Sequence, residues 1–145
     1  MLTALSTQGM RGIKTIHIAS EGGSINHAMV IAAFARRSNM TVIVSEYCIS
    51  SCTIILASAT KRIGMLKSSY LIHGASDDPS PSGQSMTAMP SRTILETNEM
   101  LKKLYIERGL NANFVEWAVH SPRAGHEKIL TKEEALKIGL LTDIN

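Results

Sequence analysis

The residues best suited to carry out a reaction lie in the stretch EYCISSCTIILAS, where Cys48 and Cys52 bracket the adjacent serines Ser50 and Ser51. The two sulfurs could bind a metal or form a redox pair. A serine hydroxyl could instead attack an acyl group, provided that the fold brings a histidine beside it. The types of residue therefore leave two chemistries open, one based on the cysteines and one based on a serine.

A zinc site would use both cysteines together with a histidine such as His73 or His17. Two cysteines separated by three residues, with no second ligand pair, match no common structural zinc pattern. The cysteine spacing thus favours either a disulfide or two buried thiols over a metal.

A serine mechanism needs partners, and two further segments offer them. Gly22 and Gly23 follow an apolar segment, and glycines without side chains let backbone N–H groups face a developing negative charge. His73 closes the apolar segment SSYLIHG and could act as a base. Each feature also has a purely structural interpretation: a tight turn for the glycines, a helix cap for a serine and a half-buried structural residue for the histidine.

These residues are brought together if they follow strands of one parallel sheet, whose carboxyl ends share an edge. Residues 14–20 alternate apolar and polar side chains and predict a strand that ends at the glycine turn. Residues 24–39 predict an amphipathic helix, and the continuously apolar residues 40–46 predict a second strand covered on both faces. The buried face of this helix is predicted to contain Ile25, Ala28, Met29, Ala32 and Ala35.

The remainder of the chain continues the alternation of strands and helices. A buried helix is predicted from Cys52, and short strands are predicted within residues 61–66 and 68–74. Residues 74–91 are rich in Gly, Ser, Pro and Asp, which predicts a mobile loop. Three more helices are predicted. The first is a long helix at 92–109, and the second is a shorter helix capped by Asn111 or Asn113. The third runs from the Thr131 cap to Gly139 and has Glu133 and Glu134 in its first turn.

Composition limits the class of protein. The 145 residues suit one domain, and the apolar and charged fractions of 44% and 19% are typical of globular proteins. A net charge of +3 with scattered basic residues argues against a nucleic-acid partner, and no apolar run is long enough to span a membrane. The N-terminal segment lacks the features of a secretory signal, which indicates a cytoplasmic protein as the chain stands, or an exported one if the N-terminus is incomplete.

Taken in chain order, these segments resemble the Clp protease proteolytic subunit, within the ClpP and crotonase superfamily. IASEGGSINHAMVIAAFAR is similar to the family's S-P-G-G-S turn and its following helix, with Glu21 in place of proline. CISSCTIILASATKR resembles the A-A-S-M-G nucleophile segment, SSYLIHG the strand that ends in the catalytic histidine, and ILTKEEALKIGLLTDI the closing motif. The C-x-S-x-C form also resembles a less characterised, often exported branch of Clp-like proteins. Four motifs in the family's order are much more specific than any one of them.

The resemblance implies a role for each residue. Ser50 would be the nucleophile, with Ser51 as the alternative if the turn is shifted by one residue, and His73 would be the base. The backbone N–H groups of Gly22 or Gly23 and of Ser51 would form the oxyanion hole. The resemblance also implies a single α/β domain built as a ClpP/crotonase-like spiral of stacked β-β-α units, with a projecting helix at about 92–108 as an oligomerisation arm.

Two departures from the family pattern accompany the resemblance. Counting back from the closing motif puts Arg123 where an aspartate is expected as third member of the triad. The nearest carboxylate is Glu127, which becomes the candidate third member, and the further stand-ins are Asp77, Asp78 and Glu116. The family's preceding strand and helix are also not matched, and a missing strand would leave a sheet edge exposed to a partner subunit.

The functional hypothesis is therefore a Clp-type serine endopeptidase that needs no cofactor and hydrolyses peptides or unfolded proteins. A homo-oligomer is expected, with an ATPase or a Clp-like subunit as a further partner. The first alternative is a weakly active or inactive Clp-like scaffold, and the second is a crotonase-type enzyme that binds acyl-CoA.

Overall fold

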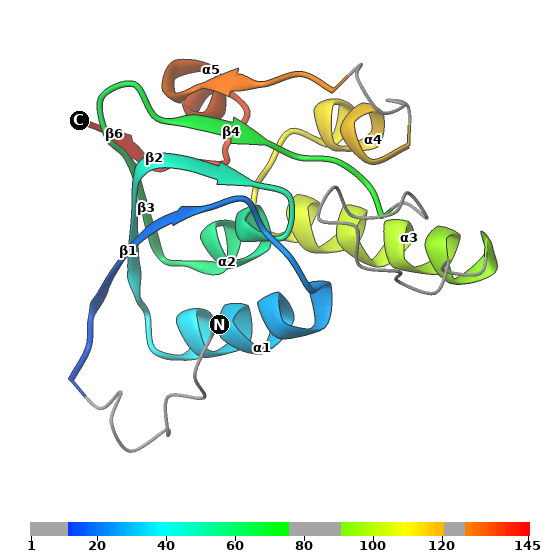
Figure 1. Ribbon diagram of the computed structural model, residues 1–145, viewed down its shortest axis with the longest axis horizontal. Coiled ribbons are helices and arrows are strands. Elements are labelled where there is room, and N and C mark those ends of the chain that lie inside the picture. Colours follow the sequence, from blue (N-terminus) through cyan, green and yellow to red (C-terminus); the bar gives the residue numbers. More distant parts are fainter. Residues whose placement is uncertain (1–11, 76–90, 121–126) are drawn as a thin grey trace.

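The centre of the structure is strand β2 (Thr41–Ile49), which has strands on both of its edges (Figure 1). The computed structural model describes residues 12–75, 91–120 and 127–145. β1 (Thr15–Ser20) runs parallel to β2 along one edge. Along the other edge, β3 (Lys61–Gly64) pairs with the first half of β2 and β4 (Ser69–Leu71) with its end, both in parallel. The end of β2, which leads to the two serines, thus lies between β1, which leads to the glycine turn, and β4, which leads to His73.

Two short strands complete the sheet. β5 (Leu130–Thr131) is antiparallel to β4, and β6 (Asp143–Ile144) is parallel to β3, which gives the order β5-β4-β2-β3-β6 with β1 attached to β2. Because this pair is antiparallel, the segment before β5 lies on the side of the pair where the chain leaves β4.

Helix α1 (Ile25–Arg37) connects β1 to β2, and its ends follow the local sequence. The Ser24 hydroxyl accepts a hydrogen bond from the His27 N–H as the N-cap, and Arg36 and Arg37 occupy the last turn. Its buried face is made of small side chains, which allow α2 (Cys52–Ser58) to pack closely against it below the sheet in Figure 1. The buried residues of α1 are Ala28, Ala32 and Ala35, and the predicted Ile25 and Met29 pack at its margin.

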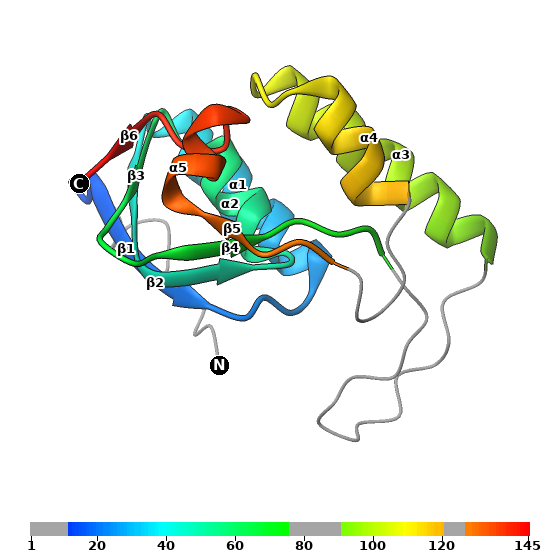
Figure 2. The same cartoon turned by 90° about the horizontal axis from the view of Figure 1, so that it is seen from above.

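Helices α3 (Ser91–Glu107) and α4 (Ala112–His120) form an antiparallel pair beside the sheet, as Figure 2 shows. Of the two predicted caps for α4, it is Asn111 that acts, because its Oδ1 accepts the Phe114 N–H at 2.9 Å. α5 (Lys132–Lys137) begins with the predicted Thr131 cap, in a reciprocal capping box with Glu134.

Three sequence predictions need correction. β2 continues to Ile49 instead of ending at Glu46, and it is not buried on both faces, because Ser45 and Glu46 are exposed. β4 ends at Leu71, so His73 lies two residues beyond the strand instead of closing it. Helix α3 begins at Ser91, and the rest of the predicted loop, residues 76–90, lies outside the described residues.

Candidate active site

Ser50 and Ser51 form the whole connection between β2 and α2, and the backbone turns sharply at Ser50. Ser50 has a φ of +58°, a conformation that is unfavourable for a residue with a Cβ. Its N–H donates to Leu71 O on β4 at 2.9 Å, and its carbonyl accepts from the N–H and the hydroxyl of Thr53. A sharp strand-to-helix turn of this kind exposes the side chain at the sheet edge, and the Ser50 side chain is half-buried.

Ser51 differs from Ser50 in both exposure and conformation. It has ordinary helical dihedral angles and is 5% exposed. Ser51 occupies the N-cap position of α2 without making a side-chain capping bond. The Ser51 hydroxyl therefore does not cap the helix, although the residue holds the N-cap position, and of the two hydroxyls the one on Ser50 is the more accessible.

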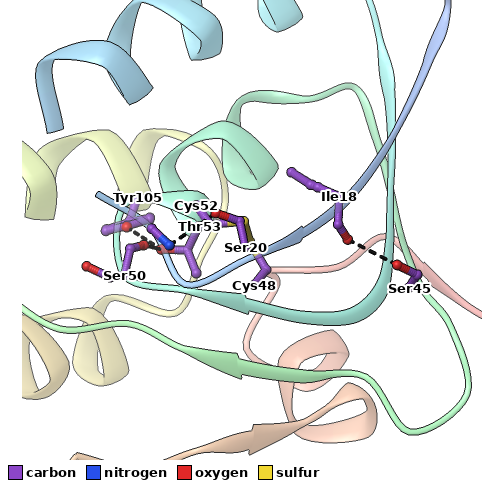
Figure 3. The surroundings of a disulfide bond; sticks show 9 residues. Ile18, Ser20, Ser45, Cys48, Ser50, Cys52, Thr53 and Tyr105 are labelled. Atoms are coloured by element: carbon purple, nitrogen blue, oxygen red, sulfur yellow. Dashed lines mark hydrogen bonds between the residues drawn. A yellow bond between two sulfur atoms is a disulfide. The ribbon is translucent and has the colours of Figure 1, made fainter. Parts of the chain in front are cut away.

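The turn is closed by a disulfide between Cys48, at the end of β2, and Cys52, the first residue of α2 (Figure 3). Both cysteines are buried, and the Ser50 hydroxyl points away from the disulfide. Within the described residues, no group of three or more His, Cys, Asp or Glu could hold a metal ion. In this structure the cysteines therefore brace the turn instead of offering thiols.

The glycine turn after β1 packs directly against the serine turn. A Cβ built on Gly22 would lie 2.7 Å from Ile49 O and 2.9 Å from the Ser50 Cβ, so the backbone approaches this closely only as glycine. The Gly22 N–H donates to the Ser20 hydroxyl at 3.1 Å. Within the described residues, the N–H groups of Gly23 and Ser51 make no hydrogen bond. These two N–H groups are therefore the candidate oxyanion donors, whereas the N–H of Gly22 is engaged.

His73 follows β4, the strand whose end pairs with the end of β2 in the register Ile49 with Leu71. Ser50 and His73 therefore leave neighbouring parallel strands at the same sheet edge, although the Ser50 hydroxyl makes no hydrogen bond within the described residues. The His73 Nδ1 lies 2.7 Å from Gly74 O. Since a carbonyl can only accept, this contact requires a proton on Nδ1, and in the neutral ring Nε2 then has the free lone pair.

Among the candidate acids, Glu127 comes three residues before β5, the strand that pairs with β4. The antiparallel register pairs Ser69 with Thr131 and Tyr70 with Leu130. The pairing ends there, because β4 ends at Leu71 and β5 begins at Leu130, so His73 and Glu127 both lie beyond the paired residues, on the same side of the pair. Glu127 also takes part in an interaction within the protein.

The other candidate acids do not lie at this edge or are not described. Glu116 lies on α4 and forms an ion pair with Lys102, and the His120 Nε2 lies 3.8 Å from its Oε1. The Lys102 ammonium is the main cause of the lowered pKa of Glu116. Asp77, Asp78 and Arg123 lie outside the described residues.

Two residues of α3 that the sequence did not single out as functional also reach this region. The Tyr105 hydroxyl lies 2.7 Å from the Thr53 hydroxyl, which in turn donates to Ser50 O (Figure 3). The Asn98 Oδ1 accepts the Ala75 N–H at 2.7 Å, two residues after His73. Asn98 is 7% exposed, and Leu101 and Tyr105 are 2% exposed. These residues are spaced i, i+3 and i+7, so they share one helix face. A polar asparagine on this otherwise apolar face was the signal in the sequence that could have identified it.

Comparison with known proteins supports the resemblance stated from the motifs. The family model described as Clp protease matches residues 1–145. The chain belongs to the Clp protease family. This assignment confirms the family predicted from the four motifs, and with it the class of hydrolases to which the chain is related. A comparison with curated proteins gave no match.

Solved structures show the same fold for this Clp family member. ClpP1 from Listeria monocytogenes is 20% identical, with a TM-score of 0.70 over 90% of this chain and 72% of that one. An asparagine-to-aspartate variant of that protein gives 21% identity, the same TM-score and the same coverage. A lysine-to-alanine variant of the 1510-N membrane-bound stomatin-specific protease, in complex with a substrate peptide, is 23% identical, with a TM-score of 0.71 over 90% of this chain and 59% of that one.

These similarities confirm the predicted α/β fold of the ClpP type. None of the helices in the described ranges has the length and apolar character that a membrane span requires.

Proposed function

We propose that this Clp family member is a serine endopeptidase in which Ser50 is the nucleophile and His73 is the general base. The observation that carries the proposal is the sharp turn at Ser50. It presents a half-buried hydroxyl at the sheet edge between the glycine turn and the segment that contains His73. Ser50 is favoured over Ser51 because Ser51 is buried and its backbone is helical.

The proposed reaction follows from the protonation state of the imidazole. His73 Nε2 accepts the Ser50 proton while Oγ attacks the peptide carbonyl, and the imidazolium then protonates the leaving amine. A general base contributes about 10²–10⁴-fold to the rate. The negative charge on the carbonyl oxygen is held by the N–H groups of Gly23 and Ser51, and each such donor contributes roughly 10²–10³-fold.

We propose Glu127 as the carboxylate that completes the site. Glu127 comes three residues before β5 and His73 two residues after β4, on the same side of the β4 and β5 pair, and a nearby negative charge would stabilise the imidazolium. Replacement of Glu127 by Gln is expected to slow the reaction with a chromogenic peptide without preventing folding. An unchanged rate would remove Glu127 from the site.

The proposed substrates are peptides or unfolded proteins, and the proposed assembly is a homo-oligomer. Large apolar side chains remain exposed along α3, as expected for an assembly surface, and they include Leu95, Met100 and Ile106. The disulfide favours an oxidising compartment, and hence the exported alternative. Two titratable thiols in protein isolated from its native host with alkylation at lysis would contradict the exported alternative.

The decisive test is labelling by a fluorophosphonate probe, which forms a covalent bond with an activated serine. We expect the wild-type protein to be labelled and Ser50→Ala to be unlabelled, with Ser51→Ala as the matched control that keeps its labelling. Labelling that survives in Ser50→Ala and disappears in Ser51→Ala would move the nucleophile by one residue. Labelling that survives in both variants would refute the proposal.

A second candidate is a non-catalytic scaffold, favoured by the observation that the Ser50 hydroxyl makes no hydrogen bond to His73. Catalytic hydrogen bonds are often long before substrate binds, so this observation is compatible with either candidate. The scaffold predicts that the folded wild-type protein is not labelled and that it associates with another Clp-like chain.

A further inference from the structure

We propose that Asn98 is a positioning residue that sets the orientation and the tautomer of His73 through the peptide group between Gly74 and Ala75. The inference rests on the proposed function, since it concerns the base of that reaction. It adds a side chain of α3 and a backbone carbonyl to the site.

The argument begins with the two hydrogen bonds of one peptide group. The Gly74 carbonyl accepts the His73 Nδ1–H at 2.7 Å, and the Ala75 N–H donates to the Asn98 Oδ1 at 2.7 Å. The C=O of one residue and the N–H of the next belong to the same planar, trans peptide and point in opposite directions. The peptide therefore connects the Asn98 amide to the imidazole, and each hydrogen bond polarises the other.

The residues packed around the peptide group between Gly74 and Ala75 leave it little room to move. Asn98 lies on the buried face of α3 and is only 7% exposed, so an unsatisfied amide there would be costly. A Cβ on Gly74 would collide with Val119 O and would lie 2.9 Å from the Asn98 Oδ1. Only a glycine lets the peptide approach both helices, and the peptide has little freedom to rotate once Asn98 holds its N–H.

The chemical consequence concerns the nitrogen that faces the nucleophile. In a serine triad, a carboxylate on the far imidazole nitrogen keeps the proton there and leaves the near nitrogen as the base. Here the Gly74 carbonyl accepts from Nδ1, and it selects the same tautomer without a charge. The two groups would therefore contribute separately: the charge of Glu127 would stabilise the imidazolium, and the carbonyl held by Asn98 would select the tautomer.

The test compares Asn98→Leu, which has a similar volume and no acceptor, with Asn98→Asp, which retains one. The ring ¹⁵N shifts of His73 report the tautomer directly, and fluorophosphonate labelling reports the reactivity of Ser50. We expect Asn98→Leu to lose the Nδ1–H tautomer and about 10²-fold in labelling rate, because small displacements of a catalytic group have effects of this size. Asn98→Asp is expected to keep the tautomer and most of the rate.

If Asn98→Leu does not fold, as judged by circular dichroism, Asn98→Ser replaces it, because a hydroxyl on a shorter side chain leaves the Ala75 N–H without its partner. Wild-type tautomer populations and labelling in a folded variant without the amide would overturn the inference. The NMR measurement needs no activity. A wild-type protein that is not labelled would therefore refute the proposed function and leave the role of Asn98 to be decided by the tautomer.

Discussion

At the scale of single residues, the site depends on backbone conformations that most side chains avoid. The positive φ of Ser50 costs about 1–2 kcal/mol for a residue with a Cβ. The cost is offset by contacts on both sides of the turn, since Leu71 O accepts its N–H and Thr53 donates twice to its carbonyl. Such strain is typical of functional positions, and here it aims the hydroxyl out of the turn.

The two glycines beside Ser50 provide a residue-level prediction. Gly22→Ala places a Cβ 2.7 Å from Ile49 O and must displace the serine turn, whereas a Cβ on Gly23 meets nothing within 4 Å. Both positions have a positive φ, so both variants carry backbone strain and only the first adds a collision. Urea unfolding should show a loss of stability about 1 kcal/mol larger for Gly22→Ala than for Gly23→Ala. Equal losses would mean that the two turns are not in close contact.

At the scale of elements, α3 contacts both halves of the candidate site. Asn98 holds the segment after His73, and two turns later Tyr105 contacts Thr53, which bonds Ser50 O. The proposed nucleophile and the proposed base follow different strands, and one face of α3 contacts a neighbour of each, namely the Thr53 hydroxyl and the Ala75 N–H. A shift of α3 along its axis would therefore change the relation between Ser50 and His73.

The Tyr105 contact predicts an alkaline dependence of stability. Burial raises the pKa of Tyr105 to about 12, although the hydrogen bond with Thr53 acts in the opposite direction. The unfolded chain loses this proton near pH 10 and the folded protein only near pH 12, so the stabilisation is complete below pH 10 and is lost as the pH rises towards 12.

Tyr105→Phe should cost about 1 kcal/mol at neutral pH through the lost hydrogen bond, and stability should fall less steeply in the variant between pH 10 and 12. Part of the slope should remain in the variant, because burial also raises the pKa of Tyr70. Urea unfolding at a series of pH values measures both effects. If stability falls equally steeply with pH in the two proteins, Tyr105 does not contribute to the alkaline loss of stability.

At the scale of the whole molecule, two parts of the surface stay uncovered by the rest of the described chain: the N-terminal half of α3 and the outer edge of β1. The N-terminal half of α3 extends beyond the rest of the protein in Figure 1, and Leu95 there is 63% exposed. Within the described residues, β1 pairs only with β2, so its outer edge is open there. An apolar helix surface and an open edge are both features that a second copy of the chain would cover.

The assembly prediction is tested by Leu95→Lys, with Val30→Lys on α1 as the matched control. Val30 is 70% exposed, so both substitutions introduce a charge at a similar exposure on a helix surface. We expect Leu95→Lys to weaken self-association by at least about tenfold in sedimentation equilibrium, which corresponds to about 1.4 kcal/mol, and Val30→Lys to leave it unchanged. The reverse result would place the interface on α1, and a monomeric wild-type protein would refute the assembly.

The sequence by itself determined the elements, the family and the order of the chemical residues. Hydrophobic periodicity and local caps such as Ser24 and Thr131 depend on neighbours a few residues away, so they can be recognised along the chain. The serine turn and the histidine were recognised in the same way, as motifs in the family's order. The prediction missed the last residues of β2 and the early end of β4, because strand ends depend on which neighbour is available for pairing.

The tertiary structure alone decided how these residues meet. The pairing of β4 with β5 and the contacts of Asn98 and Tyr105 link residues more than twenty positions apart in the chain. Such contacts depend on strand pairing and on the docking of α3, and neither leaves a periodic signal in the sequence. The candidate residues for the chemistry were therefore proposed from the sequence, whereas the contacts proposed to orient them became evident only from the fold.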